Sequence, residues 1–294
     1  MTGSPEFVDL QINGHGGVDF LAAHSVDEIR RASRSLYKSG VRYYLPTLIT
    51  AEPEQLFRSA ALIQEVKLEP REGEAQILGF HLEGPFISHA KCGVHPKHYI
   101  RTPDIDAMKE YLHIGDIRIV TLAPEIDGAL DVIKFLVDQG ITVSLGHSNA
   151  TMDQAHAGFD AGAKTVTHLY NGMSKFPGLV QAALEREGLV FQIIVDDVHV
   201  SREDVAQAII GREDRFILTN DTVAPAGSAD GQYSFGDMTI EVKNREARRL
   251  DGTLAGGIGT LAQSITILKE LGVSESAAIA AATSRPLSLI GESI

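Results

Sequence analysis

The chain has 294 residues, which suits one large α/β domain better than a small module. It carries 26 basic and 39 acidic residues, a formal net charge of −13, so its surface repels nucleic acids and anionic membranes, and we expect neither as a partner. Apolar runs stay well short of the roughly 20 residues that span a bilayer. The single cysteine, Cys92, excludes an internal disulfide and is typical of a cytoplasmic protein.

The first seven residues, MTGSPEF, lack the basic and apolar regions of a signal peptide. Their GSPEF sequence is typical of a remnant left by a cloning vector. We therefore expect residues 1–7 to be vector-derived or disordered and residues 8–294 to form one domain. A natural short polar N-terminus is the alternative.

Short apolar or β-branched runs alternate with amphipathic stretches of helical spacing. The expected strands are residues 8–12, 41–49, 76–82, 117–122, 141–145, 165–169, 190–195 and 216–218. The expected helices between them are residues 26–39, 53–67, 128–139, 152–161 and 202–210. Crossover helices make neighbouring strands parallel, so this order predicts an α/β fold, a (β/α)8 TIM barrel, with an open doubly wound sheet as the alternative.

Residues 222–257 interrupt this alternation with Gly, Pro and short alternating segments at 233–235 and 238–242. These segments predict a β-hairpin excursion after the last barrel strand. Helical spacing resumes at residues 258–271 and 274–282.

Ionisable side chains cluster where the predicted strands end. In a barrel these ends meet on one face, where active sites are built. A lone histidine at such a place is more often structural, but several converging strand ends favour a site. The side chains concerned are His81, Glu83, His147, His168, His199 and Asp221.

Glu83, His147 and His168 offer one carboxylate and two imidazoles, a set that holds one divalent metal ion and leaves room for water. Zinc is the first expectation, with Fe, Mn or Co as alternatives. A bound metal lets water ionise near neutral pH and supplies a nucleophile. The sequence therefore predicts a hydrolytic metal site.

Two further residues could complete the chemistry. Asp221 could accept the proton of the water and return it to the leaving group, or it could only stabilise a turn. His199 could polarise a carbonyl oxygen, or it could be a salt-bridged surface group beside Asp196 and Asp197. Residue type alone does not decide between the two roles of Asp221 or between the two roles of His199.

Several sequence blocks at these strand ends are specific in combination. They are HLEGPF (81–86), TLAPE (121–125), GHSNAT (146–151), THLYNGM (167–173) and APAG (224–227), with DLQINGHGG (9–17) and YLPT (44–47) earlier in the chain. Together they resemble the N-acetylglucosamine-6-phosphate deacetylase family of the amidohydrolase superfamily, from about residue 8 to residue 291. The resemblance implies a metal-dependent hydrolase that releases acetate from the acetamide of a small amino sugar phosphate.

The resemblance also implies roles for individual residues. It makes Glu83, His147 and His168 the metal ligands and Asp221 the catalytic acid and base. It makes His199 the contact to the acetyl carbonyl. Contacts to the sugar or phosphate fall to His95, Asn171 and the Gly172 backbone. Many amidohydrolases carry a His-x-His pair on the first strand for a second metal, whereas this chain has Gln11 and Asn13, so one metal is expected.

Three departures from the family pattern affect these expectations. An Arg-Glu-Pro-Gly stretch, whose arginine reaches the phosphate, often across a dimer interface, is replaced by MSKFPGL (173–179). Lys175 could contact the phosphate, but it lacks the bidentate geometry of arginine. Asp197 replaces a glycine and adds negative charge. The family's flanking β-sandwich is missing from the sequence, so we expect the barrel domain without it, and a homodimer stays open.

Two other functions remain open at this stage. The chain could deacetylate another N-acetyl amino sugar or hydrolyse a cyclic amide, because the phosphate-binding arginine is absent. Alternatively, it could be a barrel that binds a sugar without catalysing a reaction.

Overall fold

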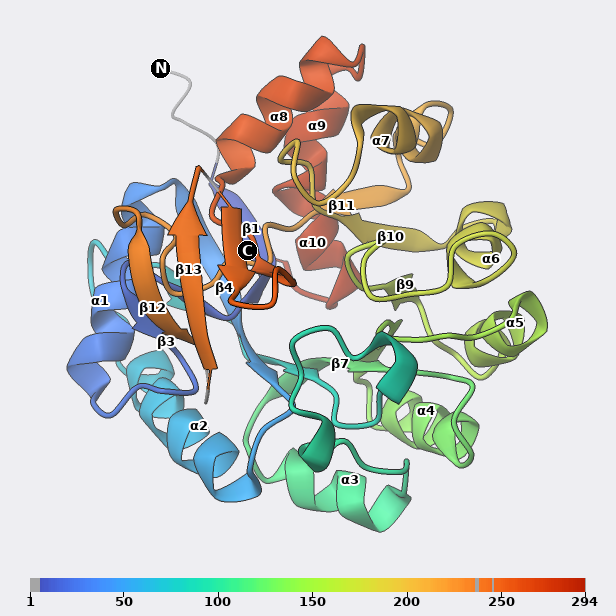
Figure 1. Ribbon diagram of the computed structural model, residues 1–294, viewed down its shortest axis with the longest axis horizontal. Helices are drawn as coiled ribbons and strands as arrows, with labels where there is room; N and C mark the ends of the chain where they lie inside the picture. Colours follow the sequence, from blue (N-terminus) through green and yellow to red (C-terminus); the bar gives the residue numbers. More distant parts are fainter. Residues whose placement is uncertain (1–5, 236–237, 245, 294) are drawn as a thin grey trace.

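The structure is a computed structural model that describes residues 6–235, 238–244 and 246–293. Within these residues the main sheet has the strand order β1-β4-β6-β7-β8-β9-β10-β11, with every pair parallel and helices around the outside (Figure 1). The strands are β1 (Phe7–Ile12), β4 (Val41–Ile49), β6 (Phe80–Glu83), β7 (Ile117–Leu122), β8 (Thr142–Leu145), β9 (Thr165–Val166), β10 (Val190–Ile193) and β11 (Phe216–Leu218). The predicted TIM barrel is confirmed.

Helices connect the strands as the sequence predicts. They are α1 (Val26–Lys38), α2 (Pro53–Leu68), α3 (Ile105–Leu112), α4 (Ala129–Asp138), α5 (Met152–Asp160), α6 (Leu179–Glu185) and α7 (Arg202–Ile209), of which α3 and α6 are additional to the prediction. Two short 3₁₀ turns, η1 (His89–Lys91) and η2 (Lys97–Tyr99), lie in the loop after β6 in the described chain. In α1 the Ser25 side chain accepts from the Glu28 backbone in a capping box, and the buried face carries Ile29 and Leu36.

The barrel is joined between its first and last strands by a buried side chain. The Asp9 carboxylate of β1 accepts hydrogen bonds from Thr219 Oγ1 at 2.8 Å and from the Asn220 backbone at 3.1 Å, just after β11. Directly after β1, the Asn13 backbone donates to the Thr222 carbonyl at 2.7 Å. These contacts complete the ring where regular strand pairing is replaced by individual hydrogen bonds.

The start of the chain carries smaller elements around β1. Phe7 already belongs to β1, one residue earlier than the predicted domain start, and residues 1–5 lie outside the described chain. A short antiparallel pair, β2 (Gly14–His15) and β3 (Val18–Asp19), follows β1. The third predicted strand divides into β5 (Gln76–Ile77), which pairs with β4, and β6.

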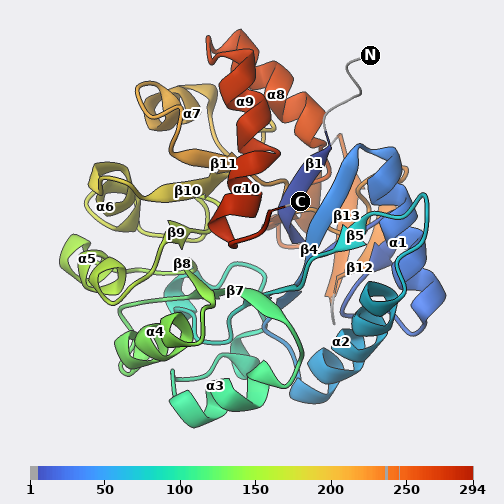
Figure 2. The same cartoon turned by 180° about the vertical axis from the view of Figure 1, so that it is seen from behind.

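The excursion after β11 is an antiparallel sheet that is larger than the predicted hairpin. The hairpin is present as β12 (Gly231–Phe235) and β13 (Met238–Lys243), and β14 (Glu246–Arg249) and β15 (Leu254–Gly256) extend it. The added strands are charged or very short, so they carry little alternating apolar pattern. The sheet lies in front of β1 and β4 in Figure 1 and behind them in Figure 2.

The last helices are α8 (Leu261–Glu270), α9 (Glu275–Ala281) and α10 (Ser284–Leu289), and α10 was not predicted. Figure 2 shows α10 across the end of the barrel from which the strands start. Leu287, Leu289 and Ile290 pack there against Val8 and Leu10 of β1. The barrel interior beneath α10 is therefore filled with apolar side chains. Within the described chain, helices long and apolar enough to cross a membrane are absent.

Candidate active site

Side chains from the carboxyl ends of the barrel strands meet at one cavity. Glu83 is the last residue of β6, while His147, His168 and Asp221 follow β8, β9 and β11 within a few positions. The cavity has a volume of about 210 Å3. It is lined by these side chains and by His95, Asn171, Gly172 and His199. The predicted residues of the site therefore come together in space, except Lys175 and also His81, whose buried ring contacts the Leu10 carbonyl and Thr121 Oγ1 instead.

The backbone turns sharply at three of these positions in the described chain. The φ angles of His147, His168 and Asp221 are +46°, +33° and +50°. Residues with a Cβ rarely adopt this left-handed region, so the surrounding structure must hold them there. This conformation ends each strand and turns the side chain into the cavity.

Glu83, His147 and His168 place three ligand atoms close together. Glu83 Oε1 lies 3.1 Å from Nε2 of His147 and 3.1 Å from Nε2 of His168, and the two Nε2 atoms are 3.1 Å apart. All three residues are buried. A carboxylate oxygen and two imidazole nitrogens suit a divalent metal ion with open positions for water or substrate.

The His147 ring is held in the orientation that a metal ligand needs. Its Nδ1 lies 2.9 Å from the Lys91 carbonyl oxygen, which can only accept, so Nδ1 carries the proton and Nε2 presents its lone pair to the cluster. Gly172 packs against the same ring, and a Cβ at Gly172 would lie 3.0 Å from His147 Nδ1. The donor set therefore fits a bound metal.

Charge at the cluster also favours a cation. Burial opposes ionisation of Glu83, but the close contacts of its carboxylate with His147 and His168 outweigh it and hold the pKa of Glu83 well below its ordinary value. Burial, followed by the charge of Glu83, raises the pKa of Asp221 to about 8. A carboxyl group whose pKa lies near neutral pH can both accept and donate a proton.

Two amide side chains at the end of β1 support these carboxylates. Gln11 Nε2 donates to Glu83 Oε1 at 3.2 Å, and Asn13 Nδ2 donates to Asp221 Oδ1 at 2.7 Å. These are the positions at which many amidohydrolases carry the His-x-His pair. Here the amides orient the carboxylates by hydrogen bonding.

His95 presents an N–H group to the cavity. Its Nδ1 accepts from the Thr50 backbone at 3.3 Å and lies 2.9 Å from Thr50 Oγ1. Because a backbone N–H can only donate, Nδ1 is unprotonated and Nε2 carries the proton. Burial, followed by the charge of His147, lowers the pKa of His95 well below its usual value. The neutral ring, whose centroid lies 4.4 Å from that of His147, offers one N–H donor among the residues that line the cavity.

His199 is oriented by the carboxylate of Asp196. Its Nδ1 lies 2.7 Å from Asp196 Oδ2, and its backbone N–H donates to Asp196 Oδ1 at 2.9 Å. The pair lies within the loop after β10, and the His199 ring lines the cavity. His199 is thus a buried, positioned side chain, in contrast to the surface group considered from the sequence.

One wall of the cavity comes from residues that sequence reasoning missed. Phe235 of β12 lines it, and so do Thr253, Leu254, Ala255 and Gly256 around β15. These residues lie far along the chain from the histidine motifs and carry no distinctive chemistry. The excursion sheet therefore forms part of the binding surface.

Lys175 and Asp197 lie away from the cavity lining. The exposed Lys175 ammonium lies 5.9 Å from the centroid of the Tyr170 ring. Both carboxylate oxygens of Asp197 accept from Arg202, each at 2.8 Å. The positive φ of Asp197, +64°, explains why a glycine suits this position, and Arg202 offsets the negative charge that the sequence led us to expect near the substrate.

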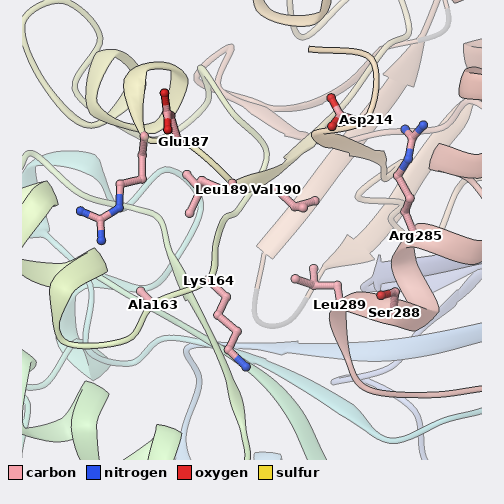
Figure 3. Close-up of a pocket in the computed structure, with 11 residues that line it drawn as sticks. Ala163, Lys164, Glu187, Leu189, Val190, Asp214, Arg285, Ser288 and Leu289 are labelled. Carbon is pink, nitrogen blue, oxygen red and sulfur yellow. The ribbon is translucent and has the colours of Figure 1, made fainter.

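A larger cavity of about 470 Å3 lies at the opposite end of the barrel. Figure 3 shows its lining, in which Lys164, Asp214 and Arg285 stand around the starts of β9 to β11 and beside α10. Arg285 Nη1 donates to the Phe216 carbonyl at 3.1 Å, so this arginine helps to fasten α10 to the barrel. None of the metal-ligand candidates lines this cavity.

A (β/α)8 barrel with a Glu-His-His cluster and an aspartate after the last strand defines a hydrolase of the amidohydrolase type. No family model matches the chain. Relatives nevertheless identify it: the chain is 34% identical over 312 residues to N-acetylglucosamine-6-phosphate deacetylase of Caenorhabditis elegans, covering 99% of this chain and 74% of the relative. The chain belongs to the N-acetylglucosamine-6-phosphate deacetylase family.

Other relatives agree with this assignment. The chain is 32% identical over 295 residues to N-acetylgalactosamine-6-phosphate deacetylase of Escherichia coli O157:H7, covering 98% of this chain and 78% of the relative. A mutant N-acetyl-D-glucosamine-6-phosphate deacetylase from Mycobacterium smegmatis, solved with N-acetyl-D-glucosamine-6-phosphate, is 34% identical with a TM-score of 0.91. That match covers 98% of this chain and 77% of the solved one. The chain thus spans about three quarters of these relatives' length.

Proposed function

We propose that this protein hydrolyses the acetamide of N-acetylglucosamine 6-phosphate to acetate and glucosamine 6-phosphate. The observation that carries the proposal is the meeting of Glu83, His147 and His168 with Asp221 and His199 in one cavity. The family to which the chain belongs supports this substrate. Deacetylation of N-acetylgalactosamine 6-phosphate is the second candidate, because one relative bears that name. We place the reaction in the cytoplasm.

We propose one divalent metal ion, zinc in the first place, held by Glu83, His147 and His168. Such an ion, when bound, supplies Lewis acidity and makes water a stronger nucleophile near neutral pH. Fe, Mn or Co accept the same ligands. The ligand chemistry thus limits the choice of metal without fixing it.

The chain's own residues then account for the proton transfers. Asp221, oriented by Asn13, accepts a proton from the attacking water and returns it to the departing nitrogen. Asp196 accepts from Nδ1 of His199 and so orients the ring, which contacts the acetyl oxygen of the substrate. His95, Asn171 and Gly172, which line the same cavity, contact the sugar.

An assay of acetate release tests this function. The purified protein, loaded with zinc, is compared on N-acetylglucosamine 6-phosphate, N-acetylgalactosamine 6-phosphate and their unphosphorylated forms, with a chelated sample as control. We expect the first substrate to have the highest kcat/KM and the chelated sample to be inactive. A metal-loaded protein that releases no acetate from any of them would contradict the proposal and favour a barrel that only binds sugar.

We predict that one equivalent of metal per chain saturates the activity. Gln11 and Asn13 already donate hydrogen bonds to Glu83 and Asp221, so the end of β1 lacks the imidazole ligands that a second ion needs. Titration of the metal-free protein with zinc, followed by elemental analysis, measures the ratio. A stoichiometry near two with both ions at this cavity would contradict the prediction.

We predict a reduced but retained preference for the phosphorylated sugar, which weakens as salt increases. In the described part of the cavity lining, lysine and arginine side chains are absent. The basic residues Lys91, Lys97 and Arg101 follow the strand of Glu83 and can attract a phosphate only from a distance, where salt screens the interaction.

Ratios of kcat/KM for the phosphorylated and unphosphorylated sugar, measured at low and high ionic strength, test this. Equal values that do not change with salt would favour deacetylation of a neutral N-acetyl sugar. A homodimer, which we keep as a proposal, could add a cation from the second copy, and size-exclusion chromatography of the assayed sample would detect it.

A further inference from the structure

We propose that Asp9 is a positioning residue for the hydrolysis, which holds the Thr219–Asp221 turn so that the Asp221 carboxyl faces the metal-ligand cluster. The proposal rests on the proposed function, because it acts through Asp221. It concerns a residue two positions before Gln11 that takes no part in metal binding and does not line the cavity.

The Asp9 carboxylate is fully buried and surrounded by hydrogen-bond donors. Oδ1 accepts from Thr219 Oγ1 at 2.8 Å and from the Gln11 backbone at 3.1 Å. Oδ2 accepts from the Asn220 backbone at 3.1 Å. One carboxylate therefore binds the end of β1 and the segment that leads directly to Asp221.

The turn itself needs such support. Asp221 adopts φ +50°, a strained conformation for a residue with a side chain. On its other side Gly257 packs so closely that a Cβ there would lie 2.0 Å from the Asn220 carbonyl oxygen, and the Gly257 backbone donates to the Asp221 carbonyl at 2.8 Å. The turn is held between Asp9 and Gly257, and Asn13 then fixes the Asp221 carboxyl.

Burying the Asp9 carboxylate between the first and last strands of the barrel costs free energy. Burial raises the pKa of Asp9 to about 6, against hydrogen bonds from Thr219, Gln11 and Asn220 that lower it. A carboxylate accepts from the two backbone N–H groups on separate oxygens, whereas an amide has only one accepting oxygen and an apolar side chain has none. This capacity explains why an ionisable group stands here.

Asp9→Asn tests the proposal with a nearly isosteric change. The amide keeps one accepting oxygen, so one of the two backbone N–H groups faces a donor and loses its partner. We expect kcat to fall by about tenfold or more, while KM stays within about twofold and metal content is unchanged. The matched control is Ser33→Ala, which removes a buried hydrogen bond of 2.8 Å to Tyr44 Oη remote from the site and should lower Tm without lowering kcat.

A double-mutant cycle with Asp221→Asn separates positioning from general stability. If Asp9 acts through Asp221, Asp9→Asn should cause no further loss of turnover in the Asp221→Asn background, while its effect on Tm stays the same in both. Multiplicative losses of turnover would show that Asp9 acts independently of Asp221. A folded, metal-loaded Asp9→Asn protein with parental kcat would make Asp9 a purely structural residue.

Two further measurements test the proposal if Asp9→Asn does not fold or if the parent shows no activity. If Asp9→Asn does not fold, Thr219→Val removes one of the same hydrogen bonds and should lower kcat by about threefold at constant KM; an unchanged kcat there would overturn the proposal. A crystal structure of Asp9→Asn does not depend on activity, and we expect the 2.7 Å bond between Asn13 and Asp221 to be lost. An undisturbed bond would refute positioning, whereas a parent that releases no acetate would refute the function alone.

Discussion

Replacing Asp221 by asparagine is expected to reduce kcat by about three orders of magnitude while metal content stays parental. Asparagine preserves the shape of the side chain and can keep a hydrogen bond to Asn13, but it can no longer accept a proton from water or return one to the amide nitrogen. Metal content should be unaffected because Asp221 is not part of the Glu83, His147 and His168 cluster. Steady-state assays and elemental analysis of the same preparation measure both quantities.

The size of the loss decides between the two interpretations of Asp221. Activity within about tenfold of the parent corresponds to about 1.4 kcal/mol in the barrier. Such a small change would mean that Asp221 only stabilises the turn after β11. A large loss together with loss of metal would instead place Asp221 among the metal ligands.

The same substitution should also change how the stability of the metal-free protein depends on pH. Burial raises the pKa of Asp221 to about 8, above its value in the unfolded chain, so the folded state binds a proton that the unfolded state releases. Stability that depends on this proton is present at low pH and lost as pH rises towards 8. Asp221→Asn should therefore raise Tm at pH 8 and leave it nearly unchanged near pH 4.

The barrel and its site could largely be predicted because their signals are local. Apolar runs such as Val41–Ile49 and Ile117–Leu122 were predicted with their observed bounds, because strands buried on both faces have few polar interruptions. Glu83, His147 and His168 follow such runs directly. Parallel strands bring their ends together, so sequence position alone indicated that these side chains meet.

One strand next to the site was predicted to be longer than it is, and the difference has a physical reason. The run at residues 165–169 reads as one strand, yet β9 ends at Val166, because His168 takes a left-handed backbone conformation to reach the cluster. Strain of this kind is maintained by tertiary contacts and leaves no mark in the hydrophobic pattern. The left-handed conformation of Asp221 likewise has no signal in the sequence, although the bounds of β11 before it were predicted as observed.

Other features depend on contacts between distant segments. Phe235 and Leu254 line the cavity only because the excursion sheet lies over β1 and β4. The bond between Asp9 and Thr219 joins residues more than two hundred positions apart, and its sequence signal is an ordinary Asp in a strand. Likewise, the charge of Asp197 was predicted from its position, but its pairing with Arg202 depends on where α7 begins.

Removing either imidazole ligand is expected to abolish both tight metal binding and measurable turnover. In His147→Ala or His168→Ala the cluster keeps one carboxylate and one imidazole, and two ligands hold a divalent ion poorly. His24→Ala is the matched control, because His24 is exposed and lies outside the cavity. It should keep the metal content, kcat and Tm of the parent.

Thermal unfolding with and without zinc distinguishes loss of the site from loss of the fold. A ligand that binds only the folded state raises Tm by an amount that grows with the logarithm of its affinity, so zinc should stabilise the parent and His24→Ala but neither cluster variant. The metal-free variants should still unfold cooperatively, since the barrel core is formed by apolar residues such as Leu48, Ile119 and Ile217, not by the cluster. Parental zinc stabilisation in both His147→Ala and His168→Ala would show that the metal binds elsewhere, and the catalytic roles assigned around this cavity would have to be reassigned with it.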